Sequence, residues 1–252
     1  MKKVKIAEMD WVSYHDRVKD GRCKIVMPVG AIEQHGPHMS LNPDVLIPEH
    51  IACRVAERSD NMLVAPPIAY GYKSQVKSGG GNFFPGTTCV SGRSLEEYVY
   101  DVILAFMEHG NREFLMINGH FENSMFLVEA ADRAVKYARL SGIELKVVLL
   151  SYWDFISEAT VKKVFPEGFA GWAVEHGGVL ETSIMLRIHP DLVDMSKVVD
   201  VPPAEFPPYD VFPPDPTWVP SSGTLSSPSK ATSEKGEWIL AECIEKIAET
   251  FS

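Results

Sequence analysis

Short apolar runs rich in β-branched residues recur along the chain and alternate with segments of helical periodicity. The runs have the length and composition of strands, and they lie at residues 24–29, 61–65, 114–118 and 145–150. Alternation of this kind is typical of an α/β fold, in which a mainly parallel central sheet is flanked by helices. We therefore expect one layered sheet with helices between successive strands.

Helix start and stop signals occupy the segments between these runs. Pro48 suits the first position of a helix that runs to about residue 58. Ser94 and Glu97 form a capping box for a helix that ends before Gly110. The remaining expected helices span about 124–140, closed by Gly142, and the C-terminal segment from about Ser233.

The length and apolar content of the chain fit a single domain with one substantial core. Hydrophobic residues make up 45% of the 252 residues, so we expect residues 1–252 to form one domain. Residues 202–228 hold nine of the 18 prolines, interleaved with aromatic residues. A flexible linker would be poor in aromatics, so we interpret this segment as an ordered, extended arm packed on its own or a neighbouring subunit. An exposed loop is the alternative.

Charge and cysteine content exclude several classes of partner and site. The formal net charge of -10 argues against nucleic acid or an anionic membrane surface as partner, because binding phosphate needs surplus Lys and Arg. The four cysteines form no CxxC pair, so neither a thiolate zinc site nor a redox dithiol is indicated. No apolar stretch of the sequence approaches the ~20 residues of a membrane span. We expect a soluble, cytoplasmic protein.

Two pairs, each of one carboxylate and one imidazole, follow predicted strands. Glu33 and His35 come after the first strand, and His120 and Glu122 come after the third. One such pair is more often a surface or core feature than a set of ligands. In open α/β sheets, however, ligands bind beyond the carboxyl ends of the strands, so both pairs can face one crevice. Two pairs of the same make-up suggest two metal ions.

Asp44 adds a third carboxylate a short loop after His35, and a carboxylate can bridge two ions. Glu33, Asp44, Glu122 and one hydroxide would balance the charge of two divalent cations, which allows the site to be buried. Mixed imidazole and carboxylate ligation suits Zn²⁺ or Mn²⁺ better than Ca²⁺ or Mg²⁺.

His176 lies between an acidic residue and two glycines, in a loop that enters a helix within residues 171–183. It is a candidate proton shuttle because imidazole titrates near neutral pH, while a capping role at the helix start is the alternative. The glycine-rich residues 77–82 lack the GK[ST] ending of a phosphate loop, so we exclude nucleotide binding. We expect these glycines to let the backbone approach a ligand, with Ser78 offering a hydroxyl.

Together these segments resemble the creatininase family over nearly the whole chain. The EQHG motif at 33–36 and the NGH-x-E-N motif at 118–123 are shared across that family. The matching stretches are 27–36, 70–74, 77–82, 84–88, 118–120, 122–124, 151–155, 175–178 and 206–213.

The resemblance implies a set of metal ligands. Glu33, Asp44 and His120 would bind one ion. His35, Asp44 and Glu122 would bind the other, so that Asp44 forms the bridge. In the family the first site favours Mn²⁺ and the second Zn²⁺, the enzyme is a homohexamer, and creatinine is hydrolysed to creatine.

The resemblance also implies roles around the pocket. His176 matches the histidine that acts as general acid or base together with Glu122. Trp153 and Trp172 match tryptophans that close over the substrate, and Ser78 matches a residue that contacts the substrate.

Two positions beside the expected pocket depart from the family pattern. Phe121, which would face the substrate, stands in place of a tyrosine, and Ala173 stands in place of an aspartate next to Trp172. Both changes remove polar groups that could hold the nitrogen atoms of creatinine, and lost hydrogen bonds have large effects on specificity.

The expected reaction opens a small cyclic amide, most simply creatinine, by attack of a metal-bound hydroxide on the ring carbonyl. Glu122 or His176 would take the proton and return it to the leaving ring nitrogen. Phe121 and Ala173 motivate an alternative, a hydrolase of the same family that acts on a cyclic keto-inositol or a formamide-type intermediate. A catalytically inactive metal-binding protein is a further alternative.

Overall fold

A computed structural model describes residues 3–251 and contains a four-stranded parallel sheet in the order β2-β1-β3-β4. The strands are β1 (Lys24–Val29), β2 (Met62–Val64), β3 (Glu113–Asn118) and β4 (Lys146–Ser151). All three pairings are parallel, and residue 24 of β1 is in register with residue 62 of β2 and residue 113 of β3. The predicted α/β fold is therefore confirmed, and the strand bounds agree with the predicted runs to within two residues.

Eight α-helices connect and flank the strands within the described residues. They are α1 (Trp11–Val18), α2 (Pro43–Glu57), α3 (Val76–Gly79), α4 (Gly92–Glu108), α5 (Ser124–Leu140), α6 (Glu158–Val164), α7 (Val179–Ile188) and α8 (Ser233–Phe251). Helices α5 and α8 begin where the sequence predicted, and Gly142 after α5 has a φ of 71°, as expected for a helix-ending glycine.

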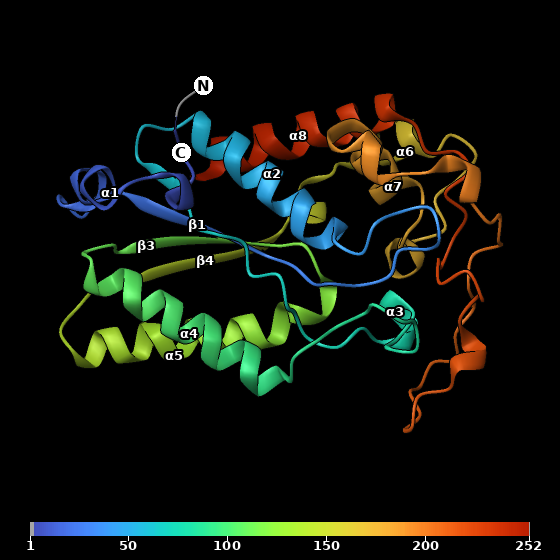
Figure 1. The fold of residues 1–252 in the computed structure, drawn as a ribbon, viewed down its shortest axis with the longest axis horizontal. Helices are drawn as coiled ribbons and strands as arrows, with labels where there is room; N and C mark the ends of the chain where they lie inside the picture. The colour runs from blue at the N-terminus through green and yellow to red at the C-terminus, as the bar shows by residue number, and fades with distance from the viewer. Residues whose placement is uncertain (1–2, 252) are drawn as a thin grey trace.

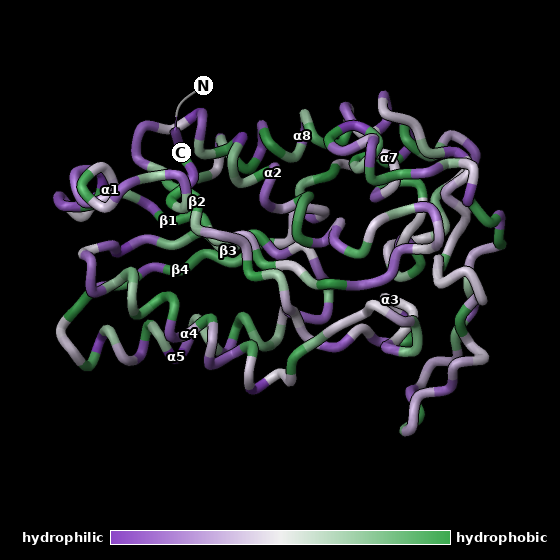
Figure 2. Tube along the Cα trace, viewed as in Figure 1, coloured by the Kyte–Doolittle hydropathy of each residue, from purple (hydrophilic) through white to green (hydrophobic). Residues whose placement is uncertain are grey.

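The sheet separates two hydrophobic cores, because successive strand residues point to opposite faces. Val26 and Leu115 pack with α2, α7 and α8 on one face, whereas Ile25 and Phe114 pack with α4 and α5 on the other. Figure 1 shows the resulting three layers, with α4 and α5 below the sheet and α2 and α8 above it. Along α4 and α5 hydrophobic and hydrophilic residues alternate, as expected for helices with one face on the sheet (Figure 2).

Two helix starts differ from the prediction. Helix α2 begins at Pro43, and Pro48 lies inside the helix. Both prolines are compatible with a first-turn position, so the sequence alone could not separate them. Helix α4 is capped by Ser91, whose Oγ accepts from the backbone N–H of Ser94 at 3.1 Å, and not by Ser94 itself.

The first turn of α2 crosses the carboxyl ends of β1 and β3 at close range. A Cβ atom at Gly30, which follows β1, or at Gly119, which follows β3, would overlap the carbonyl oxygen of Asp44. Pro48 has no N–H, so the Asp44 carbonyl has no partner four residues on in the helix. Glycine at both strand ends therefore lets α2 bring the Asp44 side chain to the edge of the sheet.

The proline-rich residues 202–228 contain no strand or α-helix and only the short 3₁₀ turn Pro216–Trp218. The two ends of this segment pair with each other, because Ala204 N–H donates to Leu225 O at 2.8 Å. Between them Phe212 is 82% and Tyr209 59% exposed, whereas Phe206 and Trp218 are half-buried. The segment is thus anchored at its base and exposed at its middle.

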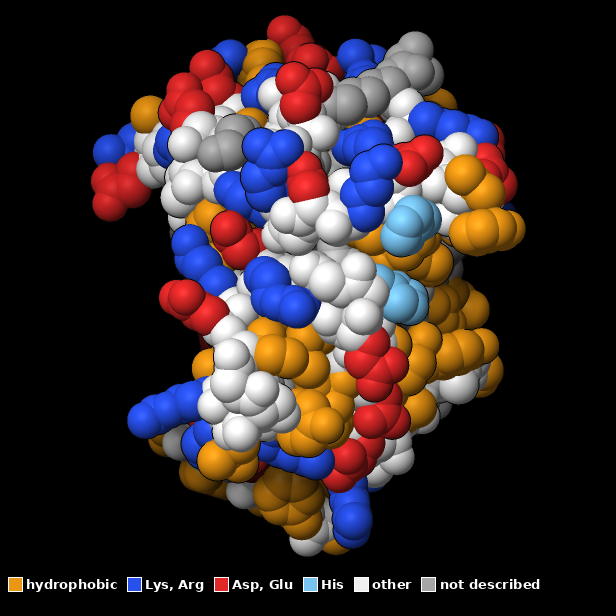
Figure 3. All heavy atoms as spheres, turned by 90° about the vertical axis from the view of Figure 1, so that its left-hand side faces the viewer, with side chains coloured by type: hydrophobic (Ala, Val, Ile, Leu, Met, Phe, Trp, Pro, Cys, Tyr) orange, Lys and Arg blue, Asp and Glu red, His pale blue; other side chains and the backbone are white. Residues whose placement is uncertain are grey.

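Among residues 3–251, none of the helices combines the length and the apolar character that crossing a bilayer requires. On the face near the amino ends of the strands, acidic and basic side chains are interspersed (Figure 3). This face lies opposite the edge of the sheet at which Asp44 is placed.

The substitution Gly119→Ala tests the close crossing of α2. Gly119 does not have a positive φ, so without crowding an alanine would stabilise the protein by about 0.4–1 kcal/mol. Because its Cβ would overlap the Asp44 carbonyl, we expect instead a loss of about 1–3 kcal/mol in the free energy of unfolding. Chemical denaturation measures this quantity. Unchanged or increased stability would show that α2 does not pack against this strand end.

Candidate metal centre

Side chains from four segments meet beyond the carboxyl ends of β1 and β3. Glu33 and His35 follow β1, and His120 follows β3. Asp44 comes from the first turn of α2, and Glu181 comes from the first turn of α7. The convergence that the sequence predicted at this edge of the sheet is present, with one additional carboxylate.

Glu33, Asp44 and His120 form the first group of possible metal ligands. All three are buried, with at most 3% of each residue exposed. His120 Nδ1 lies 3.1 Å from Asp44 Oδ2 and 3.2 Å from Glu33 Oε2. One ion in place of the proton between these atoms would have two carboxylates and one imidazole as ligands.

His35, Asp44 and Glu181 form the second group. His35 Nε2 lies 3.0 Å from Asp44 Oδ1 and 3.6 Å from Glu181 Oε2. Asp44 therefore offers one oxygen to each group, which is the geometry of a bridging carboxylate. The third member is Glu181, where the resemblance implied Glu122.

Glu122 lies on the other side of the centre. Its Oε1 accepts hydrogen bonds from Ser78 Oγ at 2.7 Å and from the backbone N–H of Gln75 at 2.8 Å. Its Oε2 lies 3.4 Å from His120 Nε2. Glu122 follows His120 in a 3₁₀ turn, Phe121–Asn123, which directs its carboxylate toward the glycine-rich segment.

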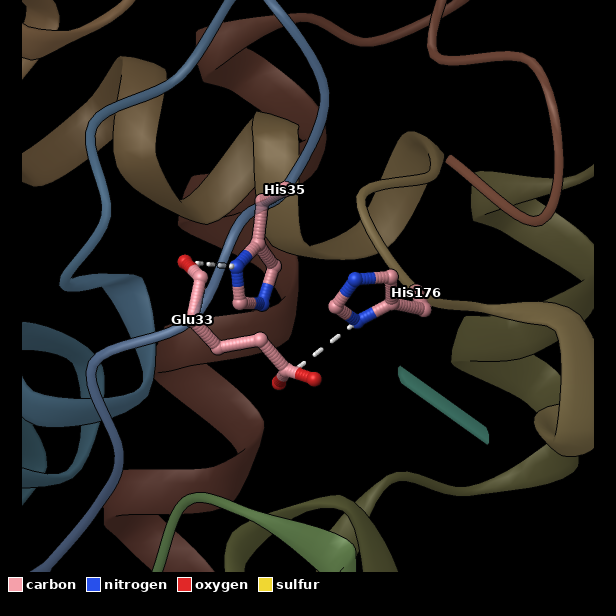
Figure 4. Close-up of side chains that lie close together, drawn as sticks. All are labelled: Glu33, His35 and His176. Atoms are coloured by element: carbon pink, nitrogen blue, oxygen red, sulfur yellow. Dashed lines mark hydrogen bonds and ion pairs between the residues drawn. The ribbon is translucent and has the colours of Figure 1, made fainter. Parts of the chain in front are cut away.

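Three histidines are held by backbone carbonyls. His35 Nδ1 lies 3.1 Å from Glu33 O, His120 Nε2 lies 3.1 Å from Tyr72 O, and His176 Nε2 lies 2.8 Å from Gln34 O. A carbonyl only accepts, so each of these ring nitrogens carries a proton. The other nitrogen of each ring faces the carboxylates. Figure 4 shows His35 next to the Glu33 carbonyl and His176 directed at the Glu33 carboxylate. Histidine ligands of metal ions are commonly oriented by this type of hydrogen bond.

The buried charges compensate one another. Burial raises the pKa of Glu33 to about 7, and His120 opposes this effect. Burial works against the charged form of His35, but Asp44 and Glu181 outweigh it and raise the His35 pKa. Burial also works against ionised Asp44, but His35 and His120 outweigh it and lower its pKa. The protons on these histidines thus supply the positive charge that divalent cations would otherwise supply.

The donor set fits two divalent cations. Glu33 Oε1 is buried without a hydrogen-bond partner among the described residues. Gly79 packs closely against this oxygen, because a Cβ at Gly79 would overlap Glu33 Oε1. Four carboxylates and two or three imidazoles around one centre match the ligand preferences of Zn²⁺ and Mn²⁺.

A cavity of about 810 Å³ opens onto this centre. The predicted pocket residues all line it, and they are Ser78, Phe121, Glu122, Trp153, Trp172 and His176. Ala173 also lines it, and Phe121 is 64% and Trp172 46% exposed, so both present apolar surface at the opening.

His176 is buried, its neighbour Glu175 is half-buried, and both are uncharged at neutral pH. Burial, together with the charge of His35, lowers the pKa of His176 well below its usual value. The His176 ring packs against His35 in a tilted arrangement, with ring centroids 4.3 Å apart and an angle of 41° between the ring planes. Burial also raises the pKa of Glu175 to about 8, although the backbone N–H of Leu180 favours its ionised form. Glu175 is therefore a protonated acid that holds the start of α7.

Sequence reasoning missed Glu181. It stands five residues after His176, and its Oε2 accepts from the backbone N–H of Gly177 at 2.7 Å. The available signal was an acidic residue in the first turn of a helix that follows a Gly-Gly pair. No imidazole lies two residues away, so a search for carboxylate and imidazole pairs does not find it.

The substitution Glu175→Gln tests whether Glu175 is protonated in the folded protein. Between pH 4.5 and about 8 the unfolded chain has released this proton while the folded protein keeps it, so the wild-type protein loses stability as pH rises. The variant lacks this penalty. Its free energy of unfolding should therefore exceed that of wild type by roughly 2–4 kcal/mol at pH 8, and by less at pH 5. Denaturant unfolding at both pH values measures the difference. Parallel pH profiles for the two proteins would contradict the assignment.

Known proteins are similar to this chain over nearly its whole length. A family model described as creatininase, creatinine amidohydrolase, matches residues 7–251. The creatinine amidohydrolase of Pseudomonas putida is 54% identical over 250 residues, which cover 98% of this chain and 96% of that protein.

Solved structures are similar to this chain as well. The E122Q variant of creatininase in a zinc–zinc form is 53% identical with a TM-score of 0.96, and a manganese form of creatininase is 54% identical with the same score. Each comparison covers 99% of this chain and 97% of the other. The chain belongs to the creatininase family.

Proposed function

We propose that this protein hydrolyses creatinine to creatine by opening the cyclic amide at a centre of two divalent metal ions. The observation that carries the proposal is the shared Asp44 carboxylate, which joins two groups of ligands, all buried except the half-buried Glu181, at a cavity. The 54% identity to the Pseudomonas putida creatinine amidohydrolase supports the substrate.

In this proposal Glu33, Asp44 and His120 hold one ion, and His35, Asp44 and Glu181 hold the other. Zn²⁺ or Mn²⁺ suits both sites, and creatininase has been solved in a zinc–zinc and in a manganese form. When bound, such ions lower the pKa of water and polarise the carbonyl group of a substrate.

Glu122 and His176 handle protons in this scheme. Water adds to the ring carbonyl carbon, the bond from that carbon to the ring nitrogen breaks, and one proton must reach the leaving nitrogen. Glu122 is held at the cavity wall by Ser78 and the Gln75 N–H, and its second oxygen is left to carry that proton. His176 lines the same cavity and presents Nδ1 as a neutral acceptor, 3.9 Å from Glu33 Oε2.

The aromatic side chains of the cavity suit a small planar ring. Trp153 packs edge-on against Tyr152 with ring centroids 5.1 Å apart, and Trp172 packs against Phe169 with ring centroids 5.0 Å apart. Phe121 adds a third apolar surface. These rings can stack on a flat substrate and exclude water from the site.

A second candidate is the hydrolysis of another small ring, and the apolar character of Phe121 and Ala173 favours it. Neither side chain can hydrogen-bond a guanidine-like nitrogen, and the cavity is larger than creatinine requires. Steady-state kinetics with creatinine, other cyclic amides and keto-inositols separates the two candidates, because the native substrate should have the highest kcat/KM.

We also propose that the protein is a homo-oligomer, with a hexamer as the expected state. The exposed Phe212 and Tyr209 of the proline-rich arm offer apolar surface for a neighbouring subunit. Met125 on α5, which is 73% exposed, offers another.

The proposed function predicts linked metal content and turnover. The purified protein should contain two zinc or manganese ions per chain by elemental analysis, and it should convert creatinine to creatine. Glu122→Gln and His176→Ala should keep the fold by circular dichroism and lower kcat by a factor of ~10² or more. Metal content without hydrolysis of creatinine or any other ring would contradict the enzymatic function, and normal turnover by either variant would contradict its role.

A further inference from the structure

Gln34 lies between two candidate metal ligands, and its side chain is fixed by three separate segments. Its Nε2 donates to Gly223 O at 2.8 Å and to Gly79 O at 3.3 Å. Its Oε1 accepts from the backbone N–H of Gly36 at 2.9 Å. Both amide hydrogens thus donate to carbonyl oxygens, and the amide oxygen accepts from an N–H. Only one orientation of this amide therefore forms all three hydrogen bonds.

The same residue contacts His176 in two ways. The backbone carbonyl of Gln34 lies 2.8 Å from His176 Nε2, and the side-chain Nε2 of Gln34 lies 3.0 Å from the same ring nitrogen. The amide nitrogen has no lone pair to offer and its hydrogens are already used. His176 Nε2 must therefore be the donor, and it donates to the backbone carbonyl. The neutral ring then keeps Nδ1 unprotonated, and this atom lies 3.9 Å from Glu33 Oε2.

Close packing holds the amide in place. A Cβ at Gly223 would overlap Gln34 Oε1, and a Cβ at Gly80 would lie 2.9 Å from Gln34 Nε2. Gly223 belongs to the base of the proline-rich arm, where the backbone N–H of Leu225 also donates to His176 O at 3.0 Å. The arm base and the glycine-rich segment therefore confine Gln34, and the arm base also holds the backbone of His176.

We propose that Gln34 is a positioning residue that keeps His176 in the tautomer protonated at Nε2, so that Nδ1 faces the reacting groups as a proton acceptor. Its side chain acts by fixing the position of its own backbone carbonyl relative to the imidazole. The importance of this tautomer for turnover rests on the proposed function, whereas the position of the proton does not.

Neutron diffraction on crystals of the perdeuterated, zinc-loaded protein tests the position of the proton. The map should show a deuteron on His176 Nε2 and none on Nδ1. A deuteron on Nδ1 with none on Nε2 would overturn the proposal, whatever reaction the protein catalyses. A failure to hydrolyse creatinine would contradict only the proposed function, so the two outcomes can be distinguished.

The substitution Gln34→Met tests the role of the side chain, because it keeps the length and removes all three hydrogen bonds. Asn111→Leu is the matched control, since Asn111 is a buried amide that donates to Phe106 O at 3.0 Å at the amino end of β3, away from the site. Both variants should lose stability, because each removes the side-chain hydrogen bonds of a buried amide. Only Gln34→Met should lower kcat, by at least ~10-fold, with two zinc ions retained and KM changed little. Equal kcat values for the two variants would overturn the proposal.

Discussion

The buried Asp44 carboxylate lies between His35 and His120, 3.0 and 3.1 Å from their ring nitrogens, and the candidate centre is arranged around it. Its position depends on the first turn of α2, which can reach the sheet edge only because Gly30 and Gly119 carry no side chain. Parallel strands β1 and β3 then place Glu33, His35 and His120 on either side of it. Packing of one helix on two strand ends thus determines where the charges meet.

Charge compensation explains why so many ionisable groups can be buried together. The neighbouring carboxylates outweigh burial and raise the pKa values of His35 and His120, and the protons that these imidazoles keep balance the carboxylate charges. Divalent ions would replace these protons and bring more positive charge to the same acidic ligands. His176 differs, because burial and the charge of His35 lower its pKa, and it stays neutral. One site thus contains imidazoles suited to bind cations and another suited to accept a proton.

Much of this arrangement could be predicted from local sequence signals, and the rest could not for physical reasons. The strands were visible because buried parallel strands are continuous apolar runs, and Glu33, His35, His120 and Glu122 were visible because they follow such runs. Prolines suit several positions near a helix start, so the true start of α2 at Pro43 was missed. Glu181 and Gln34 act through contacts between distant segments, 3.6 Å to His35 and 2.8 Å to Gly223 O, which no spacing along the chain reports.

Anomalous X-ray diffraction from crystals of the zinc-loaded protein, measured on both sides of the zinc edge, tests the centre most directly. Two peaks are predicted, one among Glu33, Asp44 and His120 and one among His35, Asp44 and Glu181, with an oxygen of Asp44 next to each. A single peak, or two peaks that do not share Asp44, would contradict the bridged two-ion centre.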